Sequence, residues 1–130
     1  AHIYIYNRSA KNAERLVSIA DDDRVSAVSE NACEKLAVDV IINATSLSLS
    51  GNVPAISDSI FANKPAVYDM VYQDVETCFI KKAKSLGCVK AIDGLGMLVG
   101  QAAESFYLWF GVRPDVKPVL EYLRQQLAKG

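Results

Sequence analysis

Tyr4-Ile5-Tyr6-Asn7-Arg8-Ser9 lies near the start of this chain of 130 residues and carries the strongest indication of its fold. Residues 3–6 are typical of a short strand, and Ser9 is a suitable N-cap for a helix over residues 11–20. The apolar residues of that helix recur at helical spacing. The segment therefore predicts a strand, a polar turn that contains Arg8, and a helix in direct succession.

Strand and helix signals alternate through the rest of the sequence. Further strands are expected at residues 25–28, 38–43, 66–70 and 89–92. Further helices are expected at residues 29–36, 76–86, 94–110 and from 114 onward, with one or two helical turns within 56–61. The 38–43 run is what a parallel strand buried on both faces would show. This alternation predicts an α/β fold with a doubly wound parallel sheet and helices on both faces.

The last two helices carry more specific expectations. Asp93 is a candidate cap for the first of them, and Pro114 suits the first turn of the second. The apolar face of the first helix would be formed by Met97, Leu98, Ala102, Phe106 and Trp109, and that of the second by Val116, Val119, Leu120, Leu123 and Leu127. Tyr107, Trp109 and Phe110 are interpreted as core or domain contacts, because a platform for stacking nucleic-acid bases would need more basic neighbours than Arg113.

Polar clusters follow four of the predicted strands. They are Asn7-Arg8-Ser9, Asn43-Ala44-Thr45-Ser46, Asp69-Met70 and Asp93-Gly94. Parallel α/β sheets bind ligands outside the carboxyl ends of their strands. We therefore expect the four clusters to line one edge of one sheet and to form a ligand site there.

Arg8 indicates which ligand that site would hold. In a dinucleotide-binding fold the second strand ends in an acid that hydrogen-bonds the ribose 2′-hydroxyl of NAD. A guanidinium at that place matches the 2′-phosphate of NADP instead, and Lys11 and the helix N-terminus add positive charge. The alternative interpretation of Asn7-Arg8-Ser9 is a solvated strand end with a helix cap. The Gly-rich strand-turn-helix that should precede this strand is not in the sequence.

Gly94-Leu95-Gly96-Met97-Leu98-Val99-Gly100 resembles a dinucleotide fingerprint but has the wrong spacing, and no ribose-binding residue follows it at the required distance. Small residues at a strand-to-helix junction would still let a flat ring approach the backbone, and Met97 could lie against that ring. Gln101 is either a satisfied core amide or a hydrogen-bonding group aimed into a cleft. Tyr72 follows a strand end by two residues and is interpreted as a packed aromatic with a solvated hydroxyl.

Composition excludes several classes. A net charge of −1 does not indicate the basic surface that nucleic-acid binding needs. No apolar run approaches the roughly 18 residues of a membrane span. Cys33, Cys78 and Cys88 are odd in number and widely spaced, which favours reduced thiols in a cytoplasmic protein. His2 is the only histidine and cannot anchor a metal site alone. We expect no metal, no membrane partner and no signal peptide.

Taken in order, these motifs resemble the carboxyl-terminal half of the shikimate dehydrogenase family. The matching segments are Asn7-Arg8-Ser9, Ile42-Asn43-Ala44-Thr45-Ser46, Tyr68-Asp69-Met70-Val71-Tyr72, Asp93 through Ala103, and Trp109 through Val116. The resemblance implies reduction of 3-dehydroshikimate to shikimate with NADPH. The implied cofactor residues are Asn7, Arg8, Ser9, Lys11, Asn12, Thr45, Met70, Gly94 and Met97, and the implied substrate residues are Tyr72 and Gln101. Lys11 and Asn12 stand where the family often carries a second arginine.

The resemblance also implies what this sequence lacks. The family's catalytic lysine and aspartate lie in an amino-terminal domain without a counterpart here, so no catalytic residue is expected among residues 1–130. The chain is interpreted as a partial NADP-binding domain with carboxyl-terminal helices, Rossmann-like but without its first strand and Gly-rich loop. Because that first strand would be central, the strands at 3–6 and 38–43 need to pair directly, to pair with a second copy as in a homodimer, or to receive the missing segment.

Two rival hypotheses remain at this stage. A quinate/shikimate enzyme that uses NAD is the first, and Arg8 argues against it because NAD favours an acid at that place. The second is a non-catalytic module that binds a nucleotide or associates with itself. In either case we expect residues 1–130 alone to have no dehydrogenase activity, since hydride transfer needs a bound substrate and a proton donor.

Overall fold

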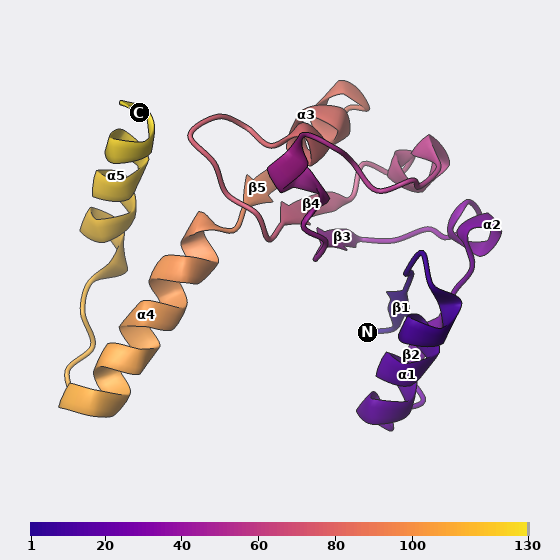
Figure 1. The fold of residues 1–130 in the computed structure, drawn as a ribbon, viewed down its shortest axis with the longest axis horizontal. Helices are drawn as coiled ribbons and strands as arrows, with labels where there is room; N and C mark the ends of the chain where they lie inside the picture. Colours follow the sequence, from indigo (N-terminus) through magenta and orange to yellow (C-terminus); the bar gives the residue numbers. More distant parts are fainter. Residues whose placement is uncertain (130) are drawn as a thin grey trace. The chain divides into compact units, whose positions relative to one another are not determined.

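The computed structural model describes residues 1–129, which divide into two compact units (Figure 1). The first unit comprises residues 1–38 and 55–63, and the second comprises residues 39–54 and the chain from Lys64 onward. All strand pairs in both units are parallel. The predicted α/β class with parallel strands is therefore confirmed, but the strands form a two-stranded and a three-stranded sheet. The expectation of one continuous sheet is wrong for the described residues.

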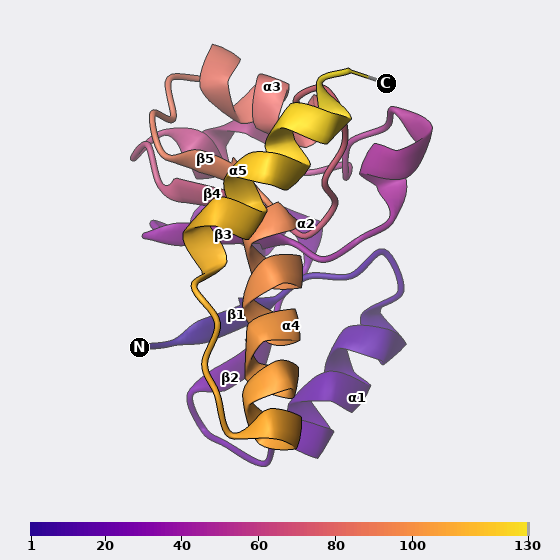
Figure 2. The same cartoon turned by 90° about the vertical axis from the view of Figure 1, so that its left-hand side faces the viewer.

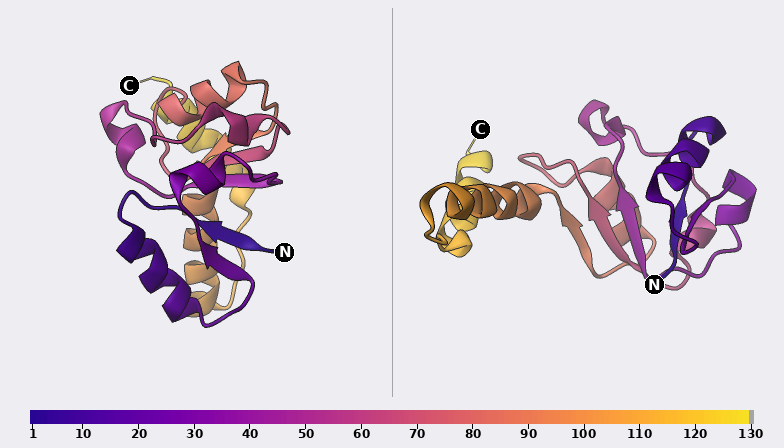
Figure 3. Two further views of the ribbon diagram at one scale, coloured as in Figure 1. Left: turned by 90° about the vertical axis from the view of Figure 1, so that its right-hand side faces the viewer. Right: turned by 90° about the horizontal axis from the view of Figure 1, so that it is seen from below.

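The first unit is a small parallel strand-helix-strand motif. It contains β1 (Ile3–Ile5), α1 (Ala10–Ala20), β2 (Val25–Ala27), α2 (Glu30–Cys33) and the 3₁₀ turn η2 (Asp58–Phe61). Figure 3 shows the indigo helix α1 beside the β1–β2 pair, against which it packs. Ala13, Cys33 and Phe61 are almost fully buried in this unit. The predicted strand, polar turn and helix at residues 3–20 thus occur in that order.

The second unit contains the three-stranded sheet and the long helices. Its elements are β3 (Val40–Asn43), the 3₁₀ turn η1 (Leu47–Ser50), β4 (Ala66–Asp69), α3 (Cys78–Ser85), β5 (Ala91–Asp93), α4 (Leu95–Phe110) and α5 (Val116–Leu127). The strand order is β3-β4-β5. Helix α5 runs back beside α4 (Figure 2). Gly87 follows α3 with φ of 88°, as predicted for a glycine that ends a helix.

Helix α3 covers one face of the three-stranded sheet, and side chains alternate between the two faces as strand geometry requires. Val67 is buried toward α3 together with Phe79 and Ile80 of that helix. On the opposite face Val40 is 55% exposed and Ile42 is 62% exposed. The expectation that the 38–43 strand is buried on both faces is therefore wrong, because β3 is the edge strand of this sheet and α3 packs against β4 and β5.

The structure also corrects the faces of the last two helices. Helix α4 buries Leu95, Val99 and Ala103, whereas Met97, Phe106 and Trp109 of the predicted face are 40%, 42% and 76% exposed. The prediction failed because nearly every position of this helix is apolar, so helical periodicity does not single out one face. Tyr107, Trp109 and Phe110 do not belong to the core of the described chain. Their expected role in a domain contact stays a prediction.

Helix α5 begins later than Pro114. Its N-cap is Asp115, whose carboxylate accepts a hydrogen bond from the amide of Lys117 at 3.1 Å. Aspartate is a favoured N-cap because its side chain accepts a hydrogen bond from an amide of the first turn. Pro118 fits that first turn because the N–H that proline lacks would have no partner within the helix there. The predicted apolar face is only half buried at Leu120, Leu123 and Leu127, and it is exposed at Val116 and Val119. No helix within residues 1–129 is long and apolar enough to cross a membrane.

The burial of Val67 generates the first prediction. Val67→Ala should lower the free energy of unfolding by about 2 kcal/mol, because two buried methyl groups are lost next to α3. Val89→Ala, the same change at a side chain that is 88% exposed, should change it by less than about 0.5 kcal/mol. Urea unfolding of the protein that contains this chain measures both values. Equal effects at the two positions would contradict the assignment of the core.

Candidate functional site

Three polar residues end the strands of the second unit, and the parallel register places them in one row. Asn43 is opposite Asp69, and Asp69 is opposite Asp93. Asn43 is 3% exposed and Asp69 is fully buried, although both lie at the end of the sheet. The structure thus brings together three of the four predicted clusters. The fourth, Asn7-Arg8-Ser9, follows β1 in the first unit and belongs to another sheet.

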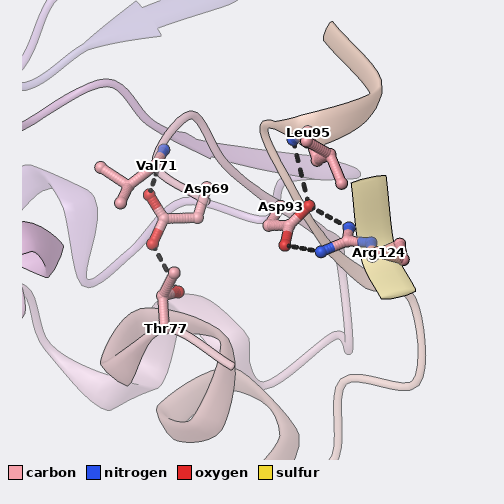
Figure 4. A network of polar contacts seen from close by, with 6 residues as sticks. All are labelled: Asp69, Val71, Thr77, Asp93, Leu95 and Arg124. Atoms are coloured by element: carbon pink, nitrogen blue, oxygen red, sulfur yellow. Dashed lines mark hydrogen bonds and ion pairs between the residues drawn. The ribbon is translucent and has the colours of Figure 1, made fainter. Parts of the chain in front are cut away.

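Asp69 is the centre of a buried polar network (Figure 4). Its Oδ1 accepts hydrogen bonds from Asn43 Nδ2 at 3.1 Å and from the amide of Val71 at 3.2 Å. Its Oδ2 accepts from Ser48 Oγ at 2.7 Å and from Thr77 Oγ1 at 2.6 Å. Thr77 is itself the N-cap of α3. The network therefore ties the turns after β3 and β4 to the start of α3.

Thr45 is positioned by Asn43. The Oδ1 of Asn43 accepts from the Thr45 amide at 3.1 Å and from the Thr45 hydroxyl at 2.8 Å. Thr45 itself is exposed. The predicted cofactor residue thus lies at the surface of the carboxyl edge, on a turn that is held from inside the unit.

At Gly94 the start of α4 comes into close contact with the backbone of Met70. A Cβ atom at this position would lie 2.0 Å from the carbonyl oxygen of Met70, and the Gly94 amide donates to the carbonyl of Val71 at 3.2 Å. Met70 and Met97 are each 40% exposed. The turn after β4 therefore lies against the start of α4, with two thioether side chains available to an apolar ring.

Asp93 joins the start of α4 to α5. Its Oδ1 accepts from the amide of Leu95 at 3.1 Å, so Asp93 does bind the first turn of α4, although Gly94 occupies the cap position itself. Both of its carboxylate oxygens also pair with the guanidinium of Arg124, Oδ2 with Nη1 at 2.6 Å (Figure 4). The hydrogen bonds that the guanidinium of Arg124 donates to Asp93 raise the pKa of Arg124 above its usual value.

A hollow of about 240 Å³ lies beside this ion pair, with Asp74, Glu76 and Arg124 among its lining residues. None of the predicted cofactor or substrate residues lines it. Its one cationic lining group, Arg124, is already paired with Asp93. The hollow therefore borders the candidate edge at Asp93, but no predicted cofactor or substrate residue lines it. Within residues 1–129 no group of three or more His, Cys, Asp or Glu side chains could hold a metal ion.

The two predicted substrate residues are both accessible. Gln101 is exposed on α4, one turn after Met97, so the interpretation as a core amide is wrong. Tyr72 is 38% exposed in the turn after β4. The structure leaves both polar groups free to meet a ligand, and their role stays a prediction.

The turn after β1 is exposed throughout, from Asn7 to Asn12. Ser9 occupies the N-cap position of α1 as predicted, but its side chain makes no capping hydrogen bond. Its amide instead donates to Oδ1 of Asn7 at 2.9 Å. No carboxylate of the described residues forms an ion pair with Arg8. An unpaired guanidinium at the start of a helix suits a phosphate.

Sequence reasoning missed the connecting residues of the site. Asp69 appeared in a polar cluster without a role, and Ser48, Thr77 and Arg124 were not considered. Thr77 could have been found as a helix cap, because a threonine precedes an apolar and basic run there. No sequence signal pairs Arg124 with Asp93, since the two residues are 31 positions apart.

Comparisons with known proteins agree with this geometry. Residues 94–124 match the family model "Shikimate 5'-dehydrogenase C-terminal domain". The "Shikimate dehydrogenase (NADP(+))" of Colwellia psychrerythraea is 52% identical over 125 residues, which are 96% of this chain and 46% of that protein. The chain thus spans about half the length of the curated relatives it matches.

Solved structures show the same similarity. An Ael1 enzyme from Pseudomonas putida superposes with a TM-score of 0.86 at 34% identity, over 97% of this chain and 45% of that one. Shikimate 5-dehydrogenase from Thermus thermophilus, in complex with NADP(H) and shikimate, gives 0.80 at 28% identity over 97% and 46%. The predicted Rossmann-like class and the resemblance to the family are confirmed.

Gly94 generates the second prediction. Gly94→Ala should lower the free energy of unfolding by about 3 kcal/mol or more, because the new methyl group meets a backbone oxygen that has no rotamer to change. Gly96→Ala lies two residues further on, where nothing is within 4 Å, and should stabilise α4 by up to about 1 kcal/mol. Denaturant unfolding distinguishes the two variants. Tolerance of Gly94→Ala would contradict the close contact of the two turns.

Proposed function

We propose, from the premise that this chain is related to the NADP-dependent shikimate dehydrogenases, that it forms part of an enzyme that reduces 3-dehydroshikimate to shikimate with NADPH. The observation that carries this proposal is the 52% identity to a curated NADP(+) enzyme over nearly the whole chain. Residues 1–130 would be a partial NADP-binding domain followed by carboxyl-terminal helices. The enzyme would work in the cytoplasm, on small-molecule substrates.

The first unit would hold the adenosine half of the cofactor. A dinucleotide fold consists of two mononucleotide-binding halves, and the phosphate lies at a helix N-terminus. Arg8 would bind the 2′-phosphate through its guanidinium, with Asn7 and Ser9 beside the ribose. Lys11 and Asn12 lie in the first turn of α1 and are exposed. All five residues carry donors or acceptors and none is buried.

The second unit would hold the nicotinamide half. The missing side chain at Gly94 lets the turn that carries Met70 lie directly against the start of α4, where the nicotinamide would bind. Met70 and Met97 would cover the ring, and Thr45 would bind the neighbouring ribose. When bound, NADPH supplies the hydride. This chain's contribution is to orient the ring and to exclude water from its apolar side.

Tyr72 and Gln101 would bind the substrate by their exposed hydroxyl and amide groups. No group of this chain is proposed to donate the proton that the reduction also needs. The chain alone should therefore be inactive. A second copy could pair with the exposed edges of β1 and β3, and light scattering on a sizing column tests that homodimer.

Arg8 generates the third prediction. In the protein that contains this chain, Arg8→Ala should raise the KM for NADPH about tenfold to a hundredfold and leave that for NADH unchanged, because a charge-assisted hydrogen bond to the 2′-phosphate is lost. Arg15→Ala removes another exposed cation from α1 and should change neither value. A rise in both KM values, or an equal effect at Arg15, would contradict the role of Arg8. An enzyme that prefers NADH would support the quinate/shikimate alternative instead.

The fourth prediction concerns the chain itself. Purified residues 1–130 should produce no NADPH from NADP and shikimate, because neither a proton acceptor nor a complete substrate site is proposed within them. Absorbance at the NADPH band measures the reaction, and the protein that contains this chain is the positive control. Measurable turnover by the chain would contradict the proposed division of the site. A non-catalytic module would be indicated if the positive control were inactive too.

A further inference from the structure

We propose that Asp69 is a positioning residue for the cofactor site, which it controls through Asn43 and Thr45. Its carboxylate would fix the direction of the Asn43 amide, and that amide would fix the Thr45 hydroxyl at the carboxyl edge of the sheet. The identity of the ligand in this inference rests on the proposed function. The positioning itself is a property of the second unit and is measurable without any ligand.

The carboxylate of Asp69 is buried and fully hydrogen-bonded. Asp69 is 0% exposed, and its four hydrogen-bond donors are all uncharged: one amide side chain, two hydroxyls and one backbone N–H. A buried carboxylate is costly unless such donors surround it. The donors come from four separate segments, namely the end of β3, η1, the turn after β4 and the cap of α3. Losing the carboxylate would therefore leave several buried groups without a partner at once.

The carboxylate of Asp69 fixes the orientation of the Asn43 side-chain amide. An ionised carboxylate only accepts hydrogen bonds, so the Nδ2 group of Asn43 must face Asp69. The Oδ1 of Asn43 must then face the other way, toward Thr45, where it accepts from both the amide and the hydroxyl. A side-chain amide has two similar orientations. The charge on Asp69 selects the one that supports the turn.

The orientation of Asn43 in turn fixes the hydroxyl of Thr45. A threonine hydroxyl has one donor and two acceptor lone pairs. The donor is committed to Asn43, and one lone pair accepts the amide of Leu47 at 3.4 Å. What remains at this exposed position is an acceptor. Thr45 would therefore suit a group that donates a hydrogen bond, such as a ribose hydroxyl, and would not suit a phosphate.

Asp69 is also connected to the proposed nicotinamide side of the site through backbone hydrogen bonds. Asp69 holds the amide of Val71, and the carbonyl of Val71 accepts from the amide of Gly94. Met70 lies between Asp69 and Val71 in the sequence, with its carbonyl against Gly94. The position of Met70 would thus depend on the same buried group as the position of Thr45.

The test is Asp69→Asn, which keeps the shape of the side chain but gives it one acceptor oxygen for four donors. We expect the backbone amide of Thr45 to exchange its hydrogen about tenfold faster and the Kd of NADPH to rise about tenfold. The Kd of 2′,5′-ADP, which carries the 2′-phosphate but no nicotinamide, should stay unchanged. The measurements are hydrogen exchange followed by NMR and titration of the two ligands into the protein that contains this chain.

Thr77→Val is the matched control. It removes a donor from the other oxygen of Asp69 and the cap of α3, so it should lower stability without turning Asn43. The ratio of the two Kd values should then stay as in the wild type. If Asp69→Asn does not fold, Asn43→Ala removes the acceptor for Thr45 directly and should give the same faster exchange and the same selective loss of NADPH affinity.

The outcomes separate the two proposals. Unchanged exchange at Thr45 in Asp69→Asn, or an equal loss of NADPH affinity in Thr77→Val, would overturn the positioning role and leave a purely structural one. A wild type that binds neither NADPH nor 2′,5′-ADP would overturn the proposed function. In that case the hydrogen exchange of Thr45 would still decide whether Asp69 orders the turn.

Discussion

Parallel pairing of β3, β4 and β5 is the constraint on which the second unit depends. Parallel strands end at the same edge of a sheet, and the register places Asn43, Asp69 and Asp93 side by side there. Because side chains alternate, Asn43 and Asp69 point to the same face as Val67, which is the face that α3 covers. Polar groups at this position are buried and must find partners inside the unit. The turns after the strands supply those partners, and this is why the edge is ordered.

The sequence predicted the element order and the polar edge, but it did not predict which groups pair. Alternation and capping signals placed α1 and α3 correctly within one or two residues. Several of the pairs that build the edge join residues 8 to 31 positions apart, such as Asp69 with Thr77 and Asp93 with Arg124. Periodicity reports only local neighbours. The buried face of α4 was mispredicted for a related reason, since a helix that is apolar at nearly every position can bury any face.

The second unit exposes several large apolar side chains. Leu108 and Trp109 at the end of α4 are 79% and 76% exposed, and Ile42 of β3 is 62% exposed. Exposed apolar side chains such as Leu108 and Trp109, which are neighbours in the sequence, are typical of faces that contact another part of a protein. Relatives are about twice as long as this chain. The predicted domain contact at Tyr107, Trp109 and Phe110 is consistent with both observations.

Arg8 and Asp69 represent opposite ways of using charge at a ligand site. Arg8 is exposed and forms no ion pair within residues 1–129, so in the proposed site water would solvate it until a phosphate bound, and the gain on binding would fall as salt rises. Asp69 is buried, so its charge must be satisfied before any ligand binds, and salt has little access to it. The first arrangement supplies recognition, whereas the second supplies a fixed geometry. The proposed cofactor site would need both kinds of group, because charge alone does not orient a ring and geometry alone does not select a phosphate.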